Sequence, residues 1–241
     1  MMSAKQQLLL LSSSLTPGGG FLEHARGFIR ELLGTKVRRV LFIPYAGVSR
    51  SYTEMTERTT AAFAEMGYEL ESLHTSKDSA ATLRTAEAVA VSGGNTFRLL
   101  SIMQSLRLLD PLRERVQGGV PYIGWSAGSN LACPTIRTTN DMPIVWPESC
   151  DALGLVPFQI NPHYTELLPP EHKGETRDDR LQEFMRLNPG MPVLGLREGT
   201  GLRVQGASIT LLGGQSAKLF HNGTSRELCP EESLEFLLQR A

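Results

Sequence analysis

The sequence has few cysteines and no long apolar run. Its three cysteines, at positions 133, 150 and 229, are too few and too scattered for a disulfide framework or a metal-binding cage, and no C-x-x-C pair occurs. An odd number of scattered thiols is typical of a reducing compartment, so we expect a cytoplasmic protein. The longest apolar run near the amino terminus, residues 8–11, is too short to cross a bilayer or to form a secretory signal, and no membrane partner is expected.

The chain also lacks an excess of charge of either sign. It has 24 basic and 25 acidic residues among 241, and no basic cluster that would bind a phosphate backbone, so no nucleic-acid partner is expected. No G-x-x-x-x-G-K-[ST] motif occurs, which disfavours a nucleotide cofactor. We therefore predict a protein that needs no metal and no organic cofactor. No feature of the sequence indicates its oligomeric state.

Apolar runs and amphipathic segments alternate regularly over the first 130 residues. The runs predict buried strands at residues 7–12, 39–44, 68–73, 88–91 and 120–124. The amphipathic segments predict helices at residues 21–33, 51–66, 80–85, 96–104 and 109–116. This alternation is typical of a doubly wound, mostly parallel sheet, and we expect residues 1–241 to form a single α/β domain.

The pattern is less regular beyond residue 130. Residues 133–145 have no clean period and predict a long ordered loop. The remaining expectations are strands at 155–160 and 193–196, a helix at 176–187, an antiparallel edge within 201–220 and a final helix at 231–239.

A G-x-S-x-G motif occupies residues 124–128, directly after an apolar run and before a segment that can continue as a helix. This strand, sharp turn and helix are what a nucleophile elbow needs to expose the hydroxyl of Ser126. The N–H of Ala127 would then lie at a helix N-terminus, where it can bind an oxyanion. The alternative is a glycine-flanked turn whose serine merely caps the helix.

A second glycine pair, Gly93 and Gly94, follows the predicted strand at residues 88–91. It should therefore lie at the carboxyl edge of the sheet, where open α/β sheets bind ligands. Its N–H groups would supply the other half of an oxyanion hole. The alternative is an ordinary turn in which Thr96 caps the next helix.

A serine nucleophile needs a base, usually histidine. The sequence offers five candidates: His24, His74, His163, His172 and His221. His163 is favoured because it directly follows a predicted strand and Pro162 stiffens the turn that presents it. His74, which ends a strand, remains a second possibility.

The histidine in turn needs a carboxylate to hold its tautomer, and two acids are candidates. Glu198 lies just past the predicted strand at 193–196, whereas Asp141 lies in the long loop that follows the elbow. The order Ser126, Asp141, His163 matches the α/β-hydrolases, and the order Ser126, His163, Glu198 does not. The order of residues therefore leaves both acids as candidates for the carboxylate that holds the histidine.

Several blocks closely resemble the peptidase E family of α-aspartyl dipeptidases. They are FIPYAGV at residues 42–48, GGNTFRL at 93–99, YIGWSAGSNLA at 122–132, CPTIRTTNDMPIV at 133–145, QINPH at 159–163 and HKGETR at 172–177. The resemblance extends from about residue 7 to about residue 200. It implies a flavodoxin-like, class I glutamine-amidotransferase-type core and a serine peptidase whose substrates are small peptides, dipeptides that begin with aspartate.

Carried over by motif, the resemblance implies Ser126 as nucleophile, His163 as base, and Gly94 and Ala127 as oxyanion donors. The third member falls on Asp141 or on Glu198. We favour Glu198, because a residue at a strand end is positioned more rigidly than one in a loop.

A substrate aspartate brings a β-carboxylate, which an arginine fork recognises well. Arg177 begins a helix capped by Thr176, where the helix dipole also favours an anion, and the resemblance points to it too. Arg137, in the loop near the elbow, is the second candidate. The alternative functions are a serine hydrolase of another acidic amide, such as an isoaspartyl or cyanophycin-type peptide, and a non-catalytic binding module on the same scaffold.

Overall fold

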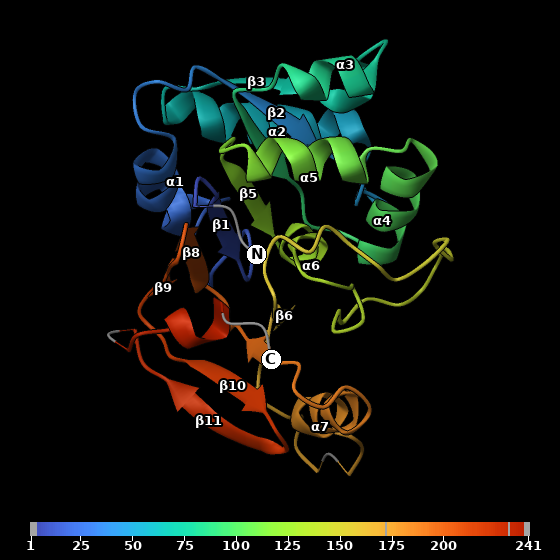
Figure 1. Cartoon of the computed structure of the whole chain (residues 1–241), viewed down its shortest axis with the longest axis vertical. Coiled ribbons are helices and arrows are strands. Elements are labelled where there is room, and N and C mark those ends of the chain that lie inside the picture. Colours follow the sequence, from blue (N-terminus) through green and yellow to red (C-terminus); the bar gives the residue numbers. More distant parts are fainter. Residues whose placement is uncertain (1–3, 172, 231, 239–241) are drawn as a thin grey trace.

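A mostly parallel sheet forms the upper part of the molecule in Figure 1. The structure is a computed structural model that describes residues 4–171, 173–230 and 232–238. The strands run in the order β3-β2-β4-β5-β1-β8-β9. Their bounds are β1 (Gln7–Leu11), β2 (Arg39–Ile43), β3 (Glu69–Ser72), β4 (Ala88–Val91), β5 (Tyr122–Trp125), β8 (Gly201–Gln205) and β9 (Ser208–Leu212). The strands from β3 to β1 pair in parallel, and β8 and β9 add an antiparallel edge, so the predicted doubly wound, mostly parallel sheet is confirmed.

Helices cover both faces of this sheet. They are α1 (Arg26–Leu33), α2 (Tyr52–Glu65), α3 (Ser79–Arg84), α4 (Thr96–Ser105), α5 (Leu109–Gln117) and α6 (Ala127–Ala132), with single 3₁₀ turns at Glu23–Ala25 and Leu73–Thr75. Successive side chains of a strand point to opposite faces. Leu9 and Leu11 of β1 therefore pack with α1 and α2, whereas Leu8 and Leu10 pack with the apolar sides of α3 to α6.

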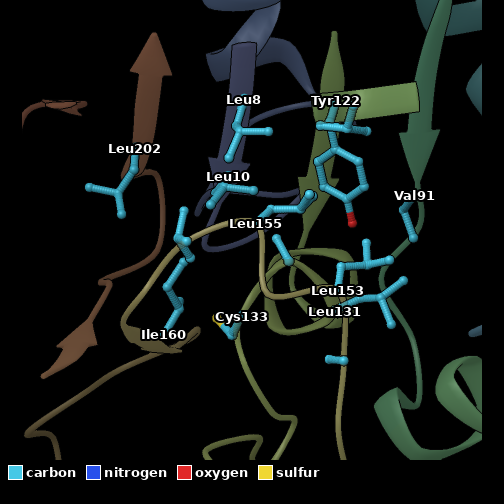
Figure 2. Packing of buried hydrophobic residues seen from close by; sticks show 14 of the residues in the cluster. Leu8, Leu10, Val91, Tyr122, Leu131, Cys133, Leu153, Leu155, Ile160 and Leu202 are labelled. Atoms are coloured by element: carbon cyan, nitrogen blue, oxygen red, sulfur yellow. The ribbon is translucent and has the colours of Figure 1, made fainter. Parts of the chain in front are cut away.

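The second of these faces holds the larger part of the core (Figure 2). Leu8, Leu10, Val91 and Tyr122 point from their strands toward the segment that follows α6, and all are fully buried. The Tyr122 hydroxyl donates a 2.6 Å hydrogen bond to the carbonyl of Gly128, which satisfies its one polar atom inside the core. This packing anchors β5 to α6, the two elements that flank Ser126.

A further sheet, with strand order β11-β10-β7-β6, lies at the lower end of the molecule in Figure 1. Its strands are β6 (Gln159–Asn161), β7 (Val193–Gly195), β10 (Ala217–His221) and β11 (Thr224–Leu228). Helix α7 (Arg177–Leu187) packs on it through Leu181 and Met185, which contact Val193, Phe220 and Tyr164. A 3₁₀ turn at Glu235–Leu238 follows near the carboxyl end.

This lower sheet is where the expectations from the sequence were partly wrong. The antiparallel edge expected within residues 201–220 divides, because β8 and β9 extend the parallel sheet while β10 pairs with β7. The strand expected at 155–160 is formed only at Gln159–Asn161, because Leu155 bonds to the Ala132 carbonyl instead of to a strand. Part of the final helix, at Glu231 and Gln239, lies outside the described residues, and between them only a 3₁₀ turn is seen. Across the described ranges, no helix is long and apolar enough to cross a membrane.

Candidate active site

The connections that leave the parallel strands converge on one cavity at the carboxyl edge of the sheet. The chain passes from β2 outward to β3 and then returns to β4 on the other side, so the strand order reverses between β2 and β4. Ligands of open α/β sheets bind at such a reversal. A cavity of about 220 Å³ lies there, and residues 47–50 after β2, residues 92–94 after β4, Ser126 and His163 line it.

Ser126 occupies a strained turn between β5 and α6. Its φ of 53° and ψ of −112° lie outside the regions that L-residues favour, at a cost of about 1–3 kcal/mol. The surrounding chain imposes this geometry: the Ser126 N–H donates to the Leu11 carbonyl at 3.0 Å. Both flanking glycines are required, because a Cβ at Gly128 would lie 2.3 Å from the Val91 oxygen and one at Gly124 2.5 Å from the Gly128 oxygen. The turn thus has the strain and tight packing of a nucleophile elbow.

Two backbone amides next to Ser126 are free to bind an oxyanion. Ala127 is the first residue of α6, and Gly94 lies in the turn between β4 and α4. Within the described part of the chain, neither N–H donates a hydrogen bond. Gly94 has a φ of 137°, and a Cβ there would lie 2.2 Å from the Ala46 oxygen, so only glycine fits. The turn touches the serine, since a Cβ on Gly93 would be 3.1 Å from that of Ser126.

His163 reaches Ser126 from the lower sheet. It follows β6 and Pro162, and its backbone also has a positive φ, 51°. Its Nε2 lies 2.9 Å from the Ser126 Oγ, and its Nδ1 lies 3.0 Å from the Glu198 Oε1. The His163 and Glu198 side chains are 40% and 49% exposed, so the row of hydrogen-bonded side chains is open to a ligand.

The end of β1 positions both His163 and Glu198. The buried hydroxyl of Ser12 donates to the Leu196 carbonyl at 2.7 Å and accepts the His163 N–H at 2.9 Å. The Ser12 N–H bonds to the Thr200 carbonyl, on the other side of Glu198. One strand end therefore fixes the backbones that carry the histidine and the carboxylate.

Asp141 lies elsewhere, at the start of α4. Its Oδ2 accepts hydrogen bonds from the N–H of Thr96 at 2.8 Å, from the Thr96 hydroxyl at 2.5 Å and from the Thr139 hydroxyl at 3.1 Å. Neighbouring Asn140 donates to the Pro162 carbonyl at 2.6 Å. The loop around Asp141 thus joins the Gly94 turn to the His163 turn, and the carboxylate that reaches the His163 ring is Glu198.

Replacing Asp141 with alanine is expected to lower the free energy of unfolding by about 1–3 kcal/mol, because the charge-assisted bonds to the Thr96 amide and hydroxyl are lost. Urea unfolding monitored by tryptophan fluorescence measures this. The matched control is Asp110→Ala. The Asp110 side chain is 79% exposed, and among the described residues its ion-pair partner is Arg113, one helical turn away, so a change within about 0.5 kcal/mol is expected. Equal effects of the two substitutions would contradict the fastening role of Asp141.

A network of charged groups lies behind His163 and Glu198. The next residue after His163, Tyr164, donates to the Asp178 Oδ1 at 2.5 Å, and Lys218 donates to the Asp178 Oδ2 at 2.6 Å. Burial and then the Asp178 carboxylate raise the pKa of Tyr164. Arg197, just before Glu198, forms ion pairs with Glu227 at 2.9 Å and Glu166 at 2.7 Å. These bonds tie α7 and β10 to the two segments that carry the histidine and the glutamate.

The two arginines expected at the site lie at opposite ends of α7. Arg177 is its first residue; it is half-buried, and in the described ranges no carboxylate pairs with it. Burial, and to a smaller extent Arg180, lowers its pKa. Arg137 donates to the Asn188 Oδ1 at 2.8 Å and lies 5.4 Å from the Phe184 ring centroid, near the far end of the helix. Neither arginine lines the cavity beside Ser126.

Three residues of the site carried no signal that we recognised in the sequence. They are Ser12, which directly follows β1, and the cavity-lining Arg50 and Arg58. A serine after a buried strand and an arginine on an amphipathic helix are both ordinary in sequence. His74, the second candidate base, instead bonds to the Ser72 hydroxyl at 2.6 Å. His172 lies outside the described residues. In the parts of the chain that are described, no three His, Cys, Asp or Glu side chains are grouped to hold a metal ion.

The fold and the site together define a class. The chain has the class I glutamine-amidotransferase-like α/β architecture, and it presents a serine, a histidine and a carboxylate in one row at the edge of its parallel sheet. More particularly, the chain belongs to peptidase family S51, whose model matches residues 8–212.

Individual relatives align with this chain over almost its whole length. Peptidase E of Nostoc sp. is 48% identical over 237 residues, which cover 98% of each chain. A Drosophila melanogaster protein named "Probable alpha-aspartyl dipeptidase" is 51% identical over 246 aligned residues, covering 99% of this chain and 100% of that one. The crystal structure of a peptidase from an acI-B1 Actinobacterium has a TM-score of 0.70 at 18% identity, covers 95% of this chain and 96% of its own, and supports the fold.

Proposed function

We propose that this protein is a serine dipeptidase that hydrolyses Asp-X dipeptides through an acyl-enzyme. The observation that carries the proposal is the pair of contacts at His163, 2.9 Å to the Ser126 hydroxyl and 3.0 Å to the Glu198 carboxylate. Both distances permit proton transfer without rearrangement. The names of the relatives, peptidase E and alpha-aspartyl dipeptidase, support the substrate class.

In the first half of the reaction, the Ser126 Oγ attacks the peptide carbonyl carbon while His163 Nε2 takes the hydroxyl proton. Glu198, bonded to Nδ1, keeps the tautomer that leaves Nε2 free to accept and stabilises the imidazolium that forms. The carbonyl oxygen becomes an oxyanion, which accepts hydrogen bonds from the free N–H groups of Gly94 and Ala127. Such preorganised donors need no rearrangement as charge develops.

In the second half, His163 returns the proton to the nitrogen of the leaving residue, and the C–N bond breaks. The aspartyl group is then an ester on Ser126. Water attacks this ester, giving its proton to His163, and the second tetrahedral intermediate releases aspartate and restores the serine hydroxyl. The exposed His163 side chain allows water to enter after the leaving residue departs.

Two groups outside the cavity beside Ser126 serve the substrate's first residue. Arg177 binds the β-carboxylate, because its acidic neighbours are already engaged: Asp178 with Lys218 and Tyr164, and Asp179 with Thr176. A half-buried guanidinium that has no carboxylate partner among the described residues gains most from an incoming anion. The Asp141 Oδ1, which accepts no bond from the described residues, pairs with the substrate ammonium.

Replacing Arg177 with methionine is expected to lower kcat/KM for Asp-Leu about 10- to 100-fold, because the loss of a charge-assisted bidentate contact costs about 1.5–3 kcal/mol. The rate with Asn-Leu, which has no β-carboxylate, should change little, so the Asp-over-Asn preference collapses. Arg180→Met is the control, since Arg180 is exposed and pairs with Glu175, which precedes α7. Unchanged selectivity in Arg177→Met would assign the β-carboxylate to another residue, with Arg137 the next to test.

The function itself is tested by comparing Asp-Leu, β-Asp-Leu, Glu-Leu and Ala-Leu as substrates of the purified protein. We expect hydrolysis of Asp-Leu well above the other three. A preference for β-Asp-Leu would instead identify a hydrolase of isoaspartyl or cyanophycin-type bonds. A second experiment uses a small serine-directed phosphonate, which we expect to label Ser126. If the phosphonate does not label Ser126 and no dipeptide is hydrolysed, the protein is a non-catalytic binding module.

A further inference from the structure

The cavity beside Ser126 contains a guanidinium that the proposed mechanism does not use. Arg58, from the middle of α2, lines this cavity together with Arg50 from the turn after β2. The Arg58 guanidinium lies 4.2 Å from the centroid of the Phe21 ring, in a cation–π contact that fixes its position. The side chain is half-buried, and over the described ranges it forms no ion pair and no hydrogen bond.

The charges around Arg58 favour an anion. Burial and then the positive charge of Arg50 lower the pKa of Arg58, and no carboxylate of the described residues opposes them. Arg50, unlike Arg58, has a carboxylate nearby. The pKa of Glu54 is lowered mainly by its hydrogen bonds from Ser51 and to a smaller extent by the positive charge of Arg50. A half-buried cation that lies near another cation and has no carboxylate partner among the described residues is stabilised by any anion that enters the cavity.

Apolar side chains form one part of the remaining cavity wall, and the hydroxyl residues Ser14, Ser49, Thr59 and Ser92 form another. Phe21, Met55 and Trp125 line the apolar part, and Leu15 and Val48 stand at its rim, 43% and 57% exposed. Its volume, about 220 Å³, is below the roughly 300–1,000 Å³ of sites for drug-sized ligands. The space therefore suits one amino-acid residue with an apolar side chain and a single negative charge.

The charges of the substrate require such a cation. An Asp-X dipeptide at neutral pH carries one ammonium and two carboxylates, the β-carboxylate of the aspartate and the α-carboxylate of X. Arg177 is outside the cavity and serves the first carboxylate, whereas Arg58 and Arg50 are the cations within the cavity that contains the nucleophile. His163, which must protonate the nitrogen of X, lines the same cavity.

We infer that Arg58 binds the free α-carboxylate of the leaving residue, so that it selects dipeptides over longer or amidated peptides, while the apolar wall around Phe21 receives the side chain of X. The inference rests on the proposed dipeptidase function. Arg50, at the rim and partly balanced by Glu54, makes the smaller contribution.

The test compares Asp-Leu with Asp-Leu-amide, which keeps the scissile bond and the aspartate but lacks the carboxylate. The unmodified protein should hydrolyse Asp-Leu at least about tenfold faster in kcat/KM. Arg58→Gln should lower kcat/KM for Asp-Leu at least about tenfold, chiefly through KM, and leave Asp-Leu-amide within about twofold. Arg58→Lys should retain part of the preference. The matched control Arg84→Gln, on the exposed end of α3, should behave like the unmodified protein.

The amide substrate also reports on folding, because a variant that fails to fold loses both activities. Equal loss on the two substrates by folded Arg58→Gln, or no loss on either, would overturn the inference. So would collapse of the Asp-over-Asn preference in this variant, since Arg58 would then bind the aspartate side chain. These outcomes all leave the unmodified protein active on Asp-Leu; inactivity of the unmodified protein on both substrates would instead remove the proposed function itself.

Discussion

Replacing Ser126 with alanine is expected to lower kcat for Asp-Leu about 10⁵- to 10⁶-fold, close to complete loss, because the proposed covalent route then has no nucleophile. The residual rate should still exceed that in water, since the Gly94 and Ala127 amides and the binding groups remain. Single-turnover measurements with Asp-Leu determine this loss. Residual turnover within about tenfold of the unmodified protein would contradict the assignment of Ser126.

The conformation of Ser126 provides an independent check through stability. Alanine at this position must adopt the same φ of 53°, so Ser126→Ala should have nearly the stability of the unmodified protein. Glycine adopts positive φ readily, so Ser126→Gly should be more stable than Ser126→Ala by up to about 1–3 kcal/mol, offset by its greater freedom when unfolded. Both variants should be inactive. A Ser126→Gly variant less stable than Ser126→Ala by about 0.5–1 kcal/mol, the full entropic cost of glycine, would argue that the turn stores no strain.

Replacing Glu198 with glutamine is expected to lower kcat about 10²- to 10⁴-fold. The glutamine amide can donate to Nδ1 and so hold the His163 tautomer whose Nε2 carries the proton, which prevents Nε2 from acting as the base. The lower end of this range reflects the 49% exposure of Glu198, because water partly replaces the lost carboxylate. Steady-state kinetics with Asp-Leu measure this effect, and KM should change little.

The comparison with Asp141 tests the assignment of the third member directly. Asp141→Ala should chiefly lower the free energy of unfolding, because its carboxylate fastens α4, and should raise KM if it pairs with the substrate ammonium as proposed. Glu198→Gln should leave the unfolding midpoint nearly unchanged. A larger fall in kcat for Asp141→Ala than for Glu198→Gln, with both proteins folded, would reverse the two roles.

The parts of the fold that local chemistry dictates could be predicted from the sequence. The runs around β1, β2 and β4 are apolar on both faces, as strands covered by helices must be, and the doubly wound sheet follows from their alternation with helices. The G-x-S-x-G turn was equally predictable, because Gly128 is needed where α6 approaches β4 and Gly124 is needed where β5 approaches α6. His163 could be ranked first among the histidines from its position after a strand.

Other parts of the fold depend on which strands pair with each other, and the period of the apolar pattern alone does not show this. The alternation in residues 201–220 predicts pairing but not that β8 joins β1 while β10 joins β7. The choice between Glu198 and Asp141 is of the same kind. Both are acids near the carboxyl edge, and what separates them is the Ser12 hydroxyl, which links β1 to the Leu196 carbonyl 184 positions away.

The sequence by itself therefore determined the doubly wound architecture, the serine on its tight turn and the glycine turn that lies next to it, because each depends on the side chains of a few adjacent residues. Only the tertiary structure decided that Glu198 rather than Asp141 meets His163, that Arg137 lies away from Arg177, and that Arg58 shares a cavity with Ser126. These depend on contacts between segments far apart along the chain. Such contacts form when the whole core packs, and no local pattern records them.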